Sequence, residues 1–408
     1  MQLLFRRCAG LDVHQKTVVA CMRWVREARV DKEVRTFATT VEGLLELLRW
    51  LQGHDCEAAV MESTGVYWKP VWAVLEGHME LVLANAQEVR NLPGRKTDVR
   101  DADWLSDLLA HGLIRSSFVP SAPLRALRDL TRTRTQLTRE ITRHTLRLQK
   151  TLEDANIKLT NVLSDILGVS GRAILEAMIG GITDPEALVA LRRKGVKATR
   201  EEMLAALHGR LTDHHRFLLR LHLDQVDALS DAVAKLDERI AEQLEPFRPQ
   251  YELLRTVPAV GDHTAAVILA EIGPDMTRFP TAGHLVSWAG LCPKSDQSAG
   301  KQRSRRLRRG NRWLKTAMVQ IGWAAARKKD GYHKRFYLNV KSRRGPKKAV
   351  VAVGASLLTS IYHVLLRSTP YQDPRPVDLT PKARQRAVNR LLRRLNGLGV
   401  QVEVKHAA

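Results

Sequence analysis

The sequence has few cysteines, and their spacing excludes two classes of small structural site. Cys8, Cys21, Cys56 and Cys292 are scattered through 408 residues, and none forms a C-x-x-C pair. Scattered cysteines do not build a disulfide framework, and unpaired ones argue against a zinc site. We therefore expect a chain that works in a reducing compartment.

Signals for membrane insertion or export are also missing. We expect no apolar run long enough to span a bilayer. The N-terminus, MQLLFRRCAGLDV, is basic but lacks the apolar core and cleavage site of a signal peptide. These absences predict a cytoplasmic protein with no membrane partner.

Acidic residues are scarce relative to basic ones. The chain has 66 Lys and Arg against 43 Asp and Glu, giving a formal net charge of +23. A chain this basic usually meets a polyanion, most often nucleic acid, although a GC-rich genome also enriches arginine. Charge does not distinguish DNA from RNA. The length predicts two or three domains.

The first 120 residues alternate between strand-like and helix-like segments, which predicts an α/β domain over 1–120. Helix 41–53 is expected to use Gly53 as its C-cap, and the last helix to end on Gly112. The predicted strands are two within 8–24, joined by a turn at 14–16, then 34–40, 56–63 and 79–85; the predicted helices are 41–53, 66–77 and 98–111.

Residues 121–250 carry apolar stripes at helical spacing. One stripe is interrupted by Arg134 and His144. Such stripes predict long helices packed as a coiled coil, within the chain or between chains, or else an ordinary helical bundle. The stripes comprise Leu127, Leu130, Leu137, Ile141, Leu148 and Leu152, then His222, Val226, Leu229, Val233, Leu236, Ile240 and Leu244.

Residues 251–368 form a third predicted unit, mainly helical, and 369–408 form a tail. LLRTVPAVGDHTAAVILAEIG reads as helix, tight turn and helix, and resembles the helix-hairpin-helix, an element that binds the DNA backbone. Its usual first turn glycine is Ala259 here, whereas Gly261 is kept. Phosphate binding and a purely structural turn both remain open.

A basic stretch follows this element. Charge runs are usually solvated faces, but this one lies between apolar helical segments and contains Gly310. We therefore expect a loop that follows DNA or RNA phosphates. Its basic members are Lys301, Arg303, Arg305, Arg306, Arg308, Arg309 and Arg312.

Four acids of the N-terminal domain could converge on a metal ion. Asp12 lies in the first predicted strand, Glu62 ends a later one, and Asp98 and Asp101 are three residues apart on one predicted helix. Carboxylates suit Mg²⁺, which phosphodiester cleavage commonly uses. Taken singly, an acid such as Asp98 is more often a helix N-cap, and Glu62 could cap the helix that follows it. Asp103 and Asp107, on the same helix, could be mistaken for the ligands.

The segments GLDVHQK, VMESTGVYW and GRKTDVRDADWL resemble the three acidic motifs of the DEDD transposases of the insertion-sequence one-ten (IS110) family. The resemblance implies a RuvC-like, RNase H-type N-terminal domain. It also implies that Asp12, Glu62, Asp98 and Asp101 are catalytic residues that bind Mg²⁺.

The segment GLCPKSDQSAGKQRSRRLRRGNRWLK resembles the second signature of the same family, and the family's nucleophilic serine falls on Ser298. Spacing alone leaves Ser295 and Ser304 as alternatives, and Arg305 stands where many relatives have glycine. The resemblance further implies a composite site, often shared between protomers of a dimer or tetramer. It also implies a noncoding bridge RNA that pairs with donor and target DNA.

Three functional hypotheses follow. The leading one is an RNA-guided DNA transposase that cuts and rejoins strands through a covalent phosphoserine, assisted by Mg²⁺. The second is a metal-dependent endonuclease, such as a junction resolvase, in which water is the nucleophile. The third is a nucleic-acid-binding protein without catalysis.

Overall fold

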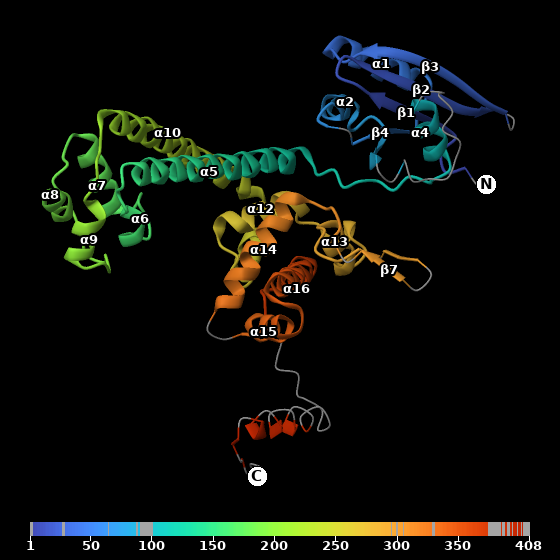
Figure 1. The fold of residues 1–408 in the computed structure, drawn as a ribbon. Helices are drawn as coiled ribbons and strands as arrows, with labels where there is room; N and C mark the ends of the chain where they lie inside the picture. Colours follow the sequence, from blue (N-terminus) through green and yellow to red (C-terminus); the bar gives the residue numbers. More distant parts are fainter. Residues whose placement is uncertain are drawn as a thin grey trace. The chain divides into compact units, whose positions relative to one another are not determined.

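The structure is a computed structural model, and it divides the chain into two compact units, Met1–Pro120 and Ser121–Ala408 (Figure 1). It describes residues 3–26, 29–63, 65–86, 89, 101–294, 296–298, 301–304, 306–328 and 331–373, with scattered positions between 385 and 402. For 296–298 and 301–304 the backbone alone is described.

Unit 1 is built on a five-stranded mixed sheet with the strand order β3-β2-β1-β4-β5. The first three strands pair antiparallel, whereas β4 and β5 run parallel to β1. The strands are β1 (Arg7–Val13), β2 (Thr17–Arg26), β3 (Arg29–Ala38), β4 (Ala58–Glu62) and β5 (Glu80–Ala84). Every strand predicted within residues 1–120 is present.

Helices cover both faces of this sheet. The helices are α1 (Val41–Gly53), α2 (Trp68–Leu75) and α4 (Asp101–Ala110). Odd-numbered residues of β1 and β4, such as Leu11 and Met61, pack with α1 and α2. Even-numbered residues, such as Cys8 and Val60, pack with Leu105 of α4. This alternation follows from the two-residue period of a strand, and it decides which side chains lie beneath α4.

The end of α1 corrects one detail of the prediction. Gly53 is the last helical residue, whereas His54 is the C-cap. The left-handed backbone conformation that usually selects glycine is taken by Asp55, with φ of 50°. Asp tolerates this conformation better than most residues, because its short polar side chain can bond locally.

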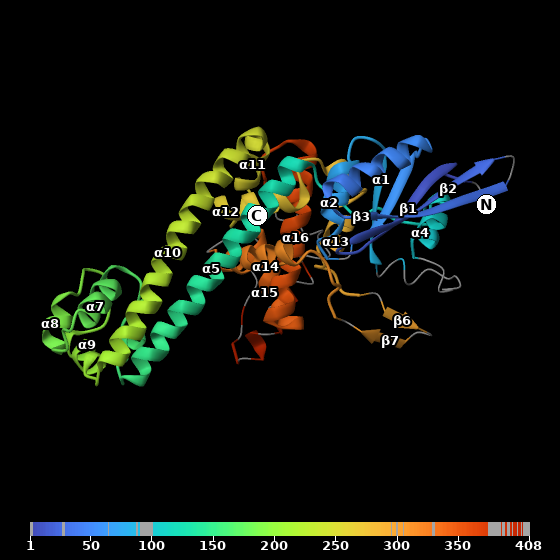
Figure 2. The same cartoon turned by 90° about the horizontal axis from the view of Figure 1, so that it is seen from above.

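Two long helices begin unit 2 and run antiparallel side by side (Figures 1 and 2). They are α5 (Ala122–Asp154) and α10 (Asp213–Leu244). The residues that interrupt the predicted stripe make polar contacts between them: Arg134 pairs with Asp237, and the rings of His144 and His222 lie 5.3 Å apart. The pairing lies within the chain; a supercoil stays a prediction.

Between the long helices, the chain forms a small helical cluster at their end. Its helices are α6 (Leu159–Val162), α7 (Val169–Ile179), α8 (Pro185–Ala190) and α9 (Arg200–Leu207). They share a hydrophobic core with Leu148 and Leu152 of α5 and Leu219 and Leu223 of α10. This separate core explains why a region without chemical motifs is nevertheless folded.

The remainder of unit 2 is a helical body with one short hairpin, so the prediction of an α/β part followed by a mainly helical part is confirmed. Its elements are η1 (Glu245–Phe247), α11 (Arg248–Arg255), α12 (Asp262–Ile272), η2 (Met276–Arg278), α13 (Ala282–Trp288), β6 (Asp296–Ser298), β7 (Lys301–Ser304), α14 (Arg312–Arg327), α15 (Tyr332–Arg344) and α16 (Pro346–Arg367).

The expectation that no apolar segment could span a bilayer is wrong by length and composition. Helix α16 has 22 residues and is apolar enough to cross a membrane. Its apolar character has a local cause, since Val353, Leu357 and Ile361 are fully buried in the core of unit 2. A helix that is apolar on all sides is expected at the centre of a large helical core.

Candidate active site

Asp12 and Glu62 stand at the ends of two neighbouring parallel strands. β1 and β4 pair with Leu11 opposite Met61, and the next residue on each strand is one of these acids. Because side chains alternate along a strand, Asp12 shares the face of Cys8, which packs beneath α4. β4 alternates in the same way, so both carboxylates belong to the face that α4 covers.

Gly10 allows α4 to lie directly on β1. A Cβ at this position would stand 2.0 Å from the carbonyl oxygen of Ala102 and 2.6 Å from the backbone nitrogen of Ser106. Both are backbone atoms of α4, so no side-chain rotation could relieve the clash. Glycine is therefore required two residues before Asp12 for a purely steric reason.

The direction of α4 brings Asp101 to the same end of the sheet. Ala102 lies against Gly10, whereas the carbonyl oxygen of Ala110 accepts a hydrogen bond from the backbone N–H of Leu4 at 2.8 Å. The helix thus runs antiparallel to β1. Asp101, its exposed first residue, stands at the edge where the acids of β1 and β4 lie.

The two other aspartates of α4 have structural partners. Asp103 Oδ1 lies 2.5 Å from Lys32 Nζ, and Asp107 Oδ2 lies 3.1 Å from the same atom. Asp107 Oδ1 also accepts from Nε of the buried Arg23 at 2.9 Å. These ion pairs hold α4 against β2 and β3. Asp103 and Asp107 therefore have a structural role.

The fourth predicted acid, Asp98, lies outside the described residues, so its place on the face of Asp101 stays a prediction. Within the described part of the chain, no three His, Cys, Asp or Glu side chains are grouped as a metal site. Asp12 Oδ2 lies 3.0 Å from His14 Nε2. The oxygen donors at this edge suit a hard cation such as Mg²⁺.

Ser298 is the last residue of β6 in a two-stranded hairpin, where it pairs in register with Lys301. The base of the hairpin is closed by backbone bonds: Lys294 N–H donates to Arg306 O at 2.9 Å, and Arg308 N–H donates to Cys292 O at 3.2 Å. Two residues separate the strands, which is the commonest loop length in β-hairpins.

The basic stretch is therefore part strand rather than a simple loop, which corrects the prediction. Lys301 and Arg303 belong to β7, and Arg305 lies outside the described residues. The four arginines that follow are exposed, namely Arg306, Arg308, Arg309 and Arg312. Arg312 begins α14, so the positive charge extends from the hairpin to the start of a helix.

The turn between α11 and α12 keeps the shape of the predicted element without its glycine. Ala259 has a φ of 66°, in the left-handed region, and Gly261 is the N-cap of α12. An L-residue in this conformation costs about 1–2 kcal/mol relative to the right-handed one. The structural requirement for the usual glycine is thus present, and phosphate binding stays a prediction.

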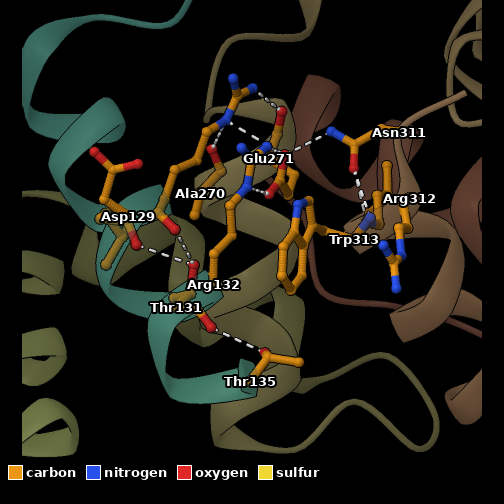
Figure 3. A network of polar contacts seen from close by, with 12 residues as sticks. Asp129, Thr131, Arg132, Thr135, Ala270, Glu271, Asn311, Arg312 and Trp313 are labelled. Atoms are coloured by element: carbon orange, nitrogen blue, oxygen red, sulfur yellow. Dashed lines mark hydrogen bonds and ion pairs between the residues drawn. The ribbon is translucent and has the colours of Figure 1, made fainter. Parts of the chain in front are cut away.

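A buried acid that the sequence analysis missed lies near the hairpin. Glu271 of α12 is fully buried, and its carboxylate contacts Arg132 of α5 and Asn311 beside α14 (Figure 3). The signal was a single acid within the apolar run AAVILAEIG. Such an acid is rarely buried unless it is paired.

A cleft of about 1090 Å³ opens in the small helical cluster, a region without a recognisable chemical motif. Arg193, Lys194 and Lys197 line it from one exposed loop. Three cations within five residues make this surface attractive to an anion.

Two family models match this chain. Residues 9–157 match the model of the DEDD transposases of the IS110 type, described as "Transposase". Residues 251–338 match the model described as "Transposase IS116/IS110/IS902 family". The first match contains Asp12, Glu62 and Asp101, which we call the carboxylate edge. The second contains the hairpin of β6 and β7 with Ser298, which we call the serine hairpin.

Curated relatives extend over most of the chain. The "Pilin gene-inverting protein" of Moraxella bovis is 24% identical over 383 residues, covering 89% of this chain and 96% of the relative. The "Probable family 20 transposase" of Pseudomonas aeruginosa is 24% identical over 371 residues, covering 89% and 94%. The "Insertion element IS110 uncharacterized 43.6 kDa protein" of Streptomyces coelicolor is 32% identical over 130 residues, covering 31% and 32%.

Proposed function

Because the chain belongs to the IS110 family of transposases, we propose that it moves an insertion sequence by cutting and rejoining DNA with a serine nucleophile and Mg²⁺. The observation that supports this proposal is that Asp12, Glu62 and Asp101, from three separate elements, lie at the same edge of unit 1. We propose that they act there as one metal-binding set, although each acid taken alone could have a purely structural role.

The strand order supports an RNase H-type, RuvC-like domain over residues 1–120. Three antiparallel strands precede two parallel ones, and the acids stand on the central pair, β1 and β4. We propose that Asp98 completes the set with Asp12, Glu62 and Asp101. When bound there, Mg²⁺ would orient the scissile phosphate and offset its charge.

Ser298 is proposed as the nucleophile. Its hydroxyl oxygen gives up its proton and attacks the phosphorus, a serine–phosphate bond forms, and the bond from phosphorus to one sugar oxygen breaks; that sugar oxygen takes up a proton. In the second step, the sugar hydroxyl of another strand gives up its proton and attacks the same phosphorus. The bond from phosphorus to the serine oxygen breaks, and the serine oxygen takes up a proton. The cations proposed to stabilise charge on the phosphate are Lys301, Arg303, Arg305, Arg306, Arg308, Arg309 and Arg312.

We propose donor and target DNA and a noncoding bridge RNA as partners. The net charge of +23 and the loop cations Arg193, Lys194 and Lys197, which line the cleft in the small helical cluster, support polyanion binding. We propose a homo-oligomer, a dimer or tetramer, in which residues 121–250 link the carboxylate domain to a serine domain at 251–368. The tail is 369–408, and the site of action is the cytoplasm.

A denaturing gel tests this chemistry against hydrolysis by a metal-dependent junction endonuclease. Purified protein is incubated with Mg²⁺, bridge RNA and end-labelled donor and target DNA, and half of each sample is digested with protease. The proposal predicts a slow-migrating, protease-sensitive DNA species that Asp12→Asn prevents. Cut DNA without any protein-linked species would favour the endonuclease. DNA that both the wild type and Asp12→Asn bind but neither processes would leave only a binding protein.

A further inference from the structure

Glu271 joins two elements that are distant in sequence. Its side chain is fully buried, and Arg132 of α5 donates to both carboxylate oxygens, at 2.7 and 2.8 Å. Asn311 Nδ2 donates to Oε2 at 2.6 Å. Arg128 Nε lies 3.4 Å from the same oxygen. A buried carboxylate is tolerated when it is paired and bonded in this way.

Asn311 connects the buried Glu271 to the start of α14. Its Oδ1 accepts from the backbone N–H groups of Trp313 and Leu314, at 3.0 and 2.9 Å, so it is the N-cap of the helix. Its amide group is the part that reaches Glu271 (Figure 3). Both ends of the Asn311 side chain are therefore held, which fixes its rotamer.

The same residue lies at the base of the serine hairpin. Asn311 N–H donates to the carbonyl oxygen of Trp288 at 3.3 Å. A Cβ on the preceding Gly310 would lie 2.5 Å from the backbone nitrogen of Gly290, so the chains entering and leaving the hairpin touch here. Beyond this contact, the hairpin is closed by the Lys294–Arg306 and Arg308–Cys292 backbone bonds.

Trp313 adds a second contact between α14 and α5. The guanidinium carbons of Arg132 and Arg139 each lie 5.6 Å from its ring centroid. Arg132 therefore bonds Glu271 through its nitrogens, and its guanidinium group also lies over the ring of Trp313. Cation–π contacts of this kind add to the ion pair and share one side chain with it.

We propose that Glu271 is a positioning residue for Ser298, acting through Asn311. The inference rests on the proposed function of the hairpin. The carboxylate holds the base of the hairpin against α5 and α12, so that the serine at its end reaches the scissile phosphate in one orientation. Losing the carboxylate keeps every cation of the hairpin but misplaces the nucleophile.

The first variant is Glu271→Gln, which keeps the size of the side chain. Its new amide group would face guanidinium donors, so one of the two bonds to Arg132 is lost. Because a displacement of about 1 Å can cost about a hundredfold in rate, we expect the protein–DNA adduct to form roughly 10 to 100 times more slowly, with unchanged DNA affinity. The matched control is Glu140→Gln, which removes an exposed ion pair with Arg143 on α5.

A compensating pair separates positioning from general stability. Asn311→Asp keeps the cap of α14, because Asp and Asn cap equally well, but it sets two carboxylates against each other. Combining Asn311→Asp with Glu271→Gln restores a donor–acceptor pair and keeps one negative charge beside the arginines. We expect each single variant to be slow and the double variant to recover to within about threefold of the wild type.

Amide hydrogen exchange measures how firmly the base of the hairpin is held, independently of DNA cleavage. In Glu271→Gln, the amides of Lys294, Arg308 and Asn311 should exchange faster, whereas those of the core helix α16 stay unchanged. Uniform acceleration that includes α16, wild-type adduct formation by Glu271→Gln, or failure of the double variant to recover would each overturn the proposal. If Ser298→Ala recombines normally, the proposed function fails, and the exchange rates still decide whether Glu271 holds the hairpin.

Discussion

The carboxylate edge of unit 1 and the serine hairpin of unit 2 are positioned by different physical means. The acids stand at strand ends and at a helix start, and their places follow from sheet register and from the packing of α4 on Gly10. The serine lies on a short hairpin whose base is held by a buried polar network. The edge is thus a product of core packing, whereas the hairpin depends on a few specific bonds.

The largest difference in activity is expected between substitutions of two aspartates in the first turn of α4. Asp101→Asn should slow recombination by about a thousandfold or more, because a metal-ligand carboxylate contributes several kcal/mol. Asp103→Asn is the matched control: Asp103 pairs with Lys32, so recombination should stay near the wild-type rate while the free energy of unfolding falls by at most about 1 kcal/mol. Single-turnover assays with Mg²⁺ measure both. Equal losses would remove Asp101 from the site.

Gly10→Ala tests whether packing places the edge. The new Cβ would meet two backbone atoms of α4 closer than 3 Å, so the helix must move. We expect a loss of about 3 kcal/mol in the free energy of unfolding, measured by denaturant titration. Gly53→Ala is the control, because a Cβ there meets nothing within 4 Å. It should stabilise α1 by about 0.5–1 kcal/mol, and similar behaviour of the two variants would contradict the packing argument.

Ala259→Gly tests the turn that precedes α12. Ala259 holds a left-handed conformation at a cost that glycine avoids, partly offset by the greater freedom of glycine in the unfolded chain. We expect a gain of roughly 0.5–1 kcal/mol in the free energy of unfolding. Thermal unfolding of the two proteins side by side measures it. A loss of stability would show that the methyl group of Ala259 contributes more through its contacts than the backbone strain costs.

The smallest expected effect is the pH dependence of the stability of unit 2 around His333. Burial lowers the pKa of His333, and the negative charge of Asp373 opposes the shift. The unfolded chain therefore binds the proton more readily, so the stability that His333 contributes is complete above its ordinary pKa of about 6.5 and falls as the pH drops below it. Hydrogen exchange of α15 amides between pH 8 and 5.5 should show this loss. His333→Asn should flatten the slope, and an unchanged slope would assign it to other groups.

The elements of unit 1 could be predicted from the sequence because period-two and period-3.6 patterns are local. The same alternation also placed Asp12 and Glu62 on their strands, and α4 docks on the sheet through Leu105 and Leu108. The face of the sheet that they share required the register of β1 on β4, which is a long-range pairing. Local patterns do not specify such pairings.

The support of the serine hairpin could not be predicted for the same reason. Glu271 and Arg132 are separated by 139 residues, and Glu271 and Asn311 by 40. A sequence shows a lone acid in an apolar helix, but only the fold shows which cations neutralise it. The basic stretch predicts a loop because its charge run hides the pairing of 296–298 with 301–304, which is only three to four residues long.

The most direct test of the account is the recombination rate of Ser298→Ala on donor and target DNA. Ser304→Ala, in the neighbouring strand β7, is the matched control, and Ser295→Ala tests the other serine. The account predicts no recombinant product from Ser298→Ala and near wild-type product from the other two. Normal recombination by Ser298→Ala would contradict the central claim that this serine is the nucleophile.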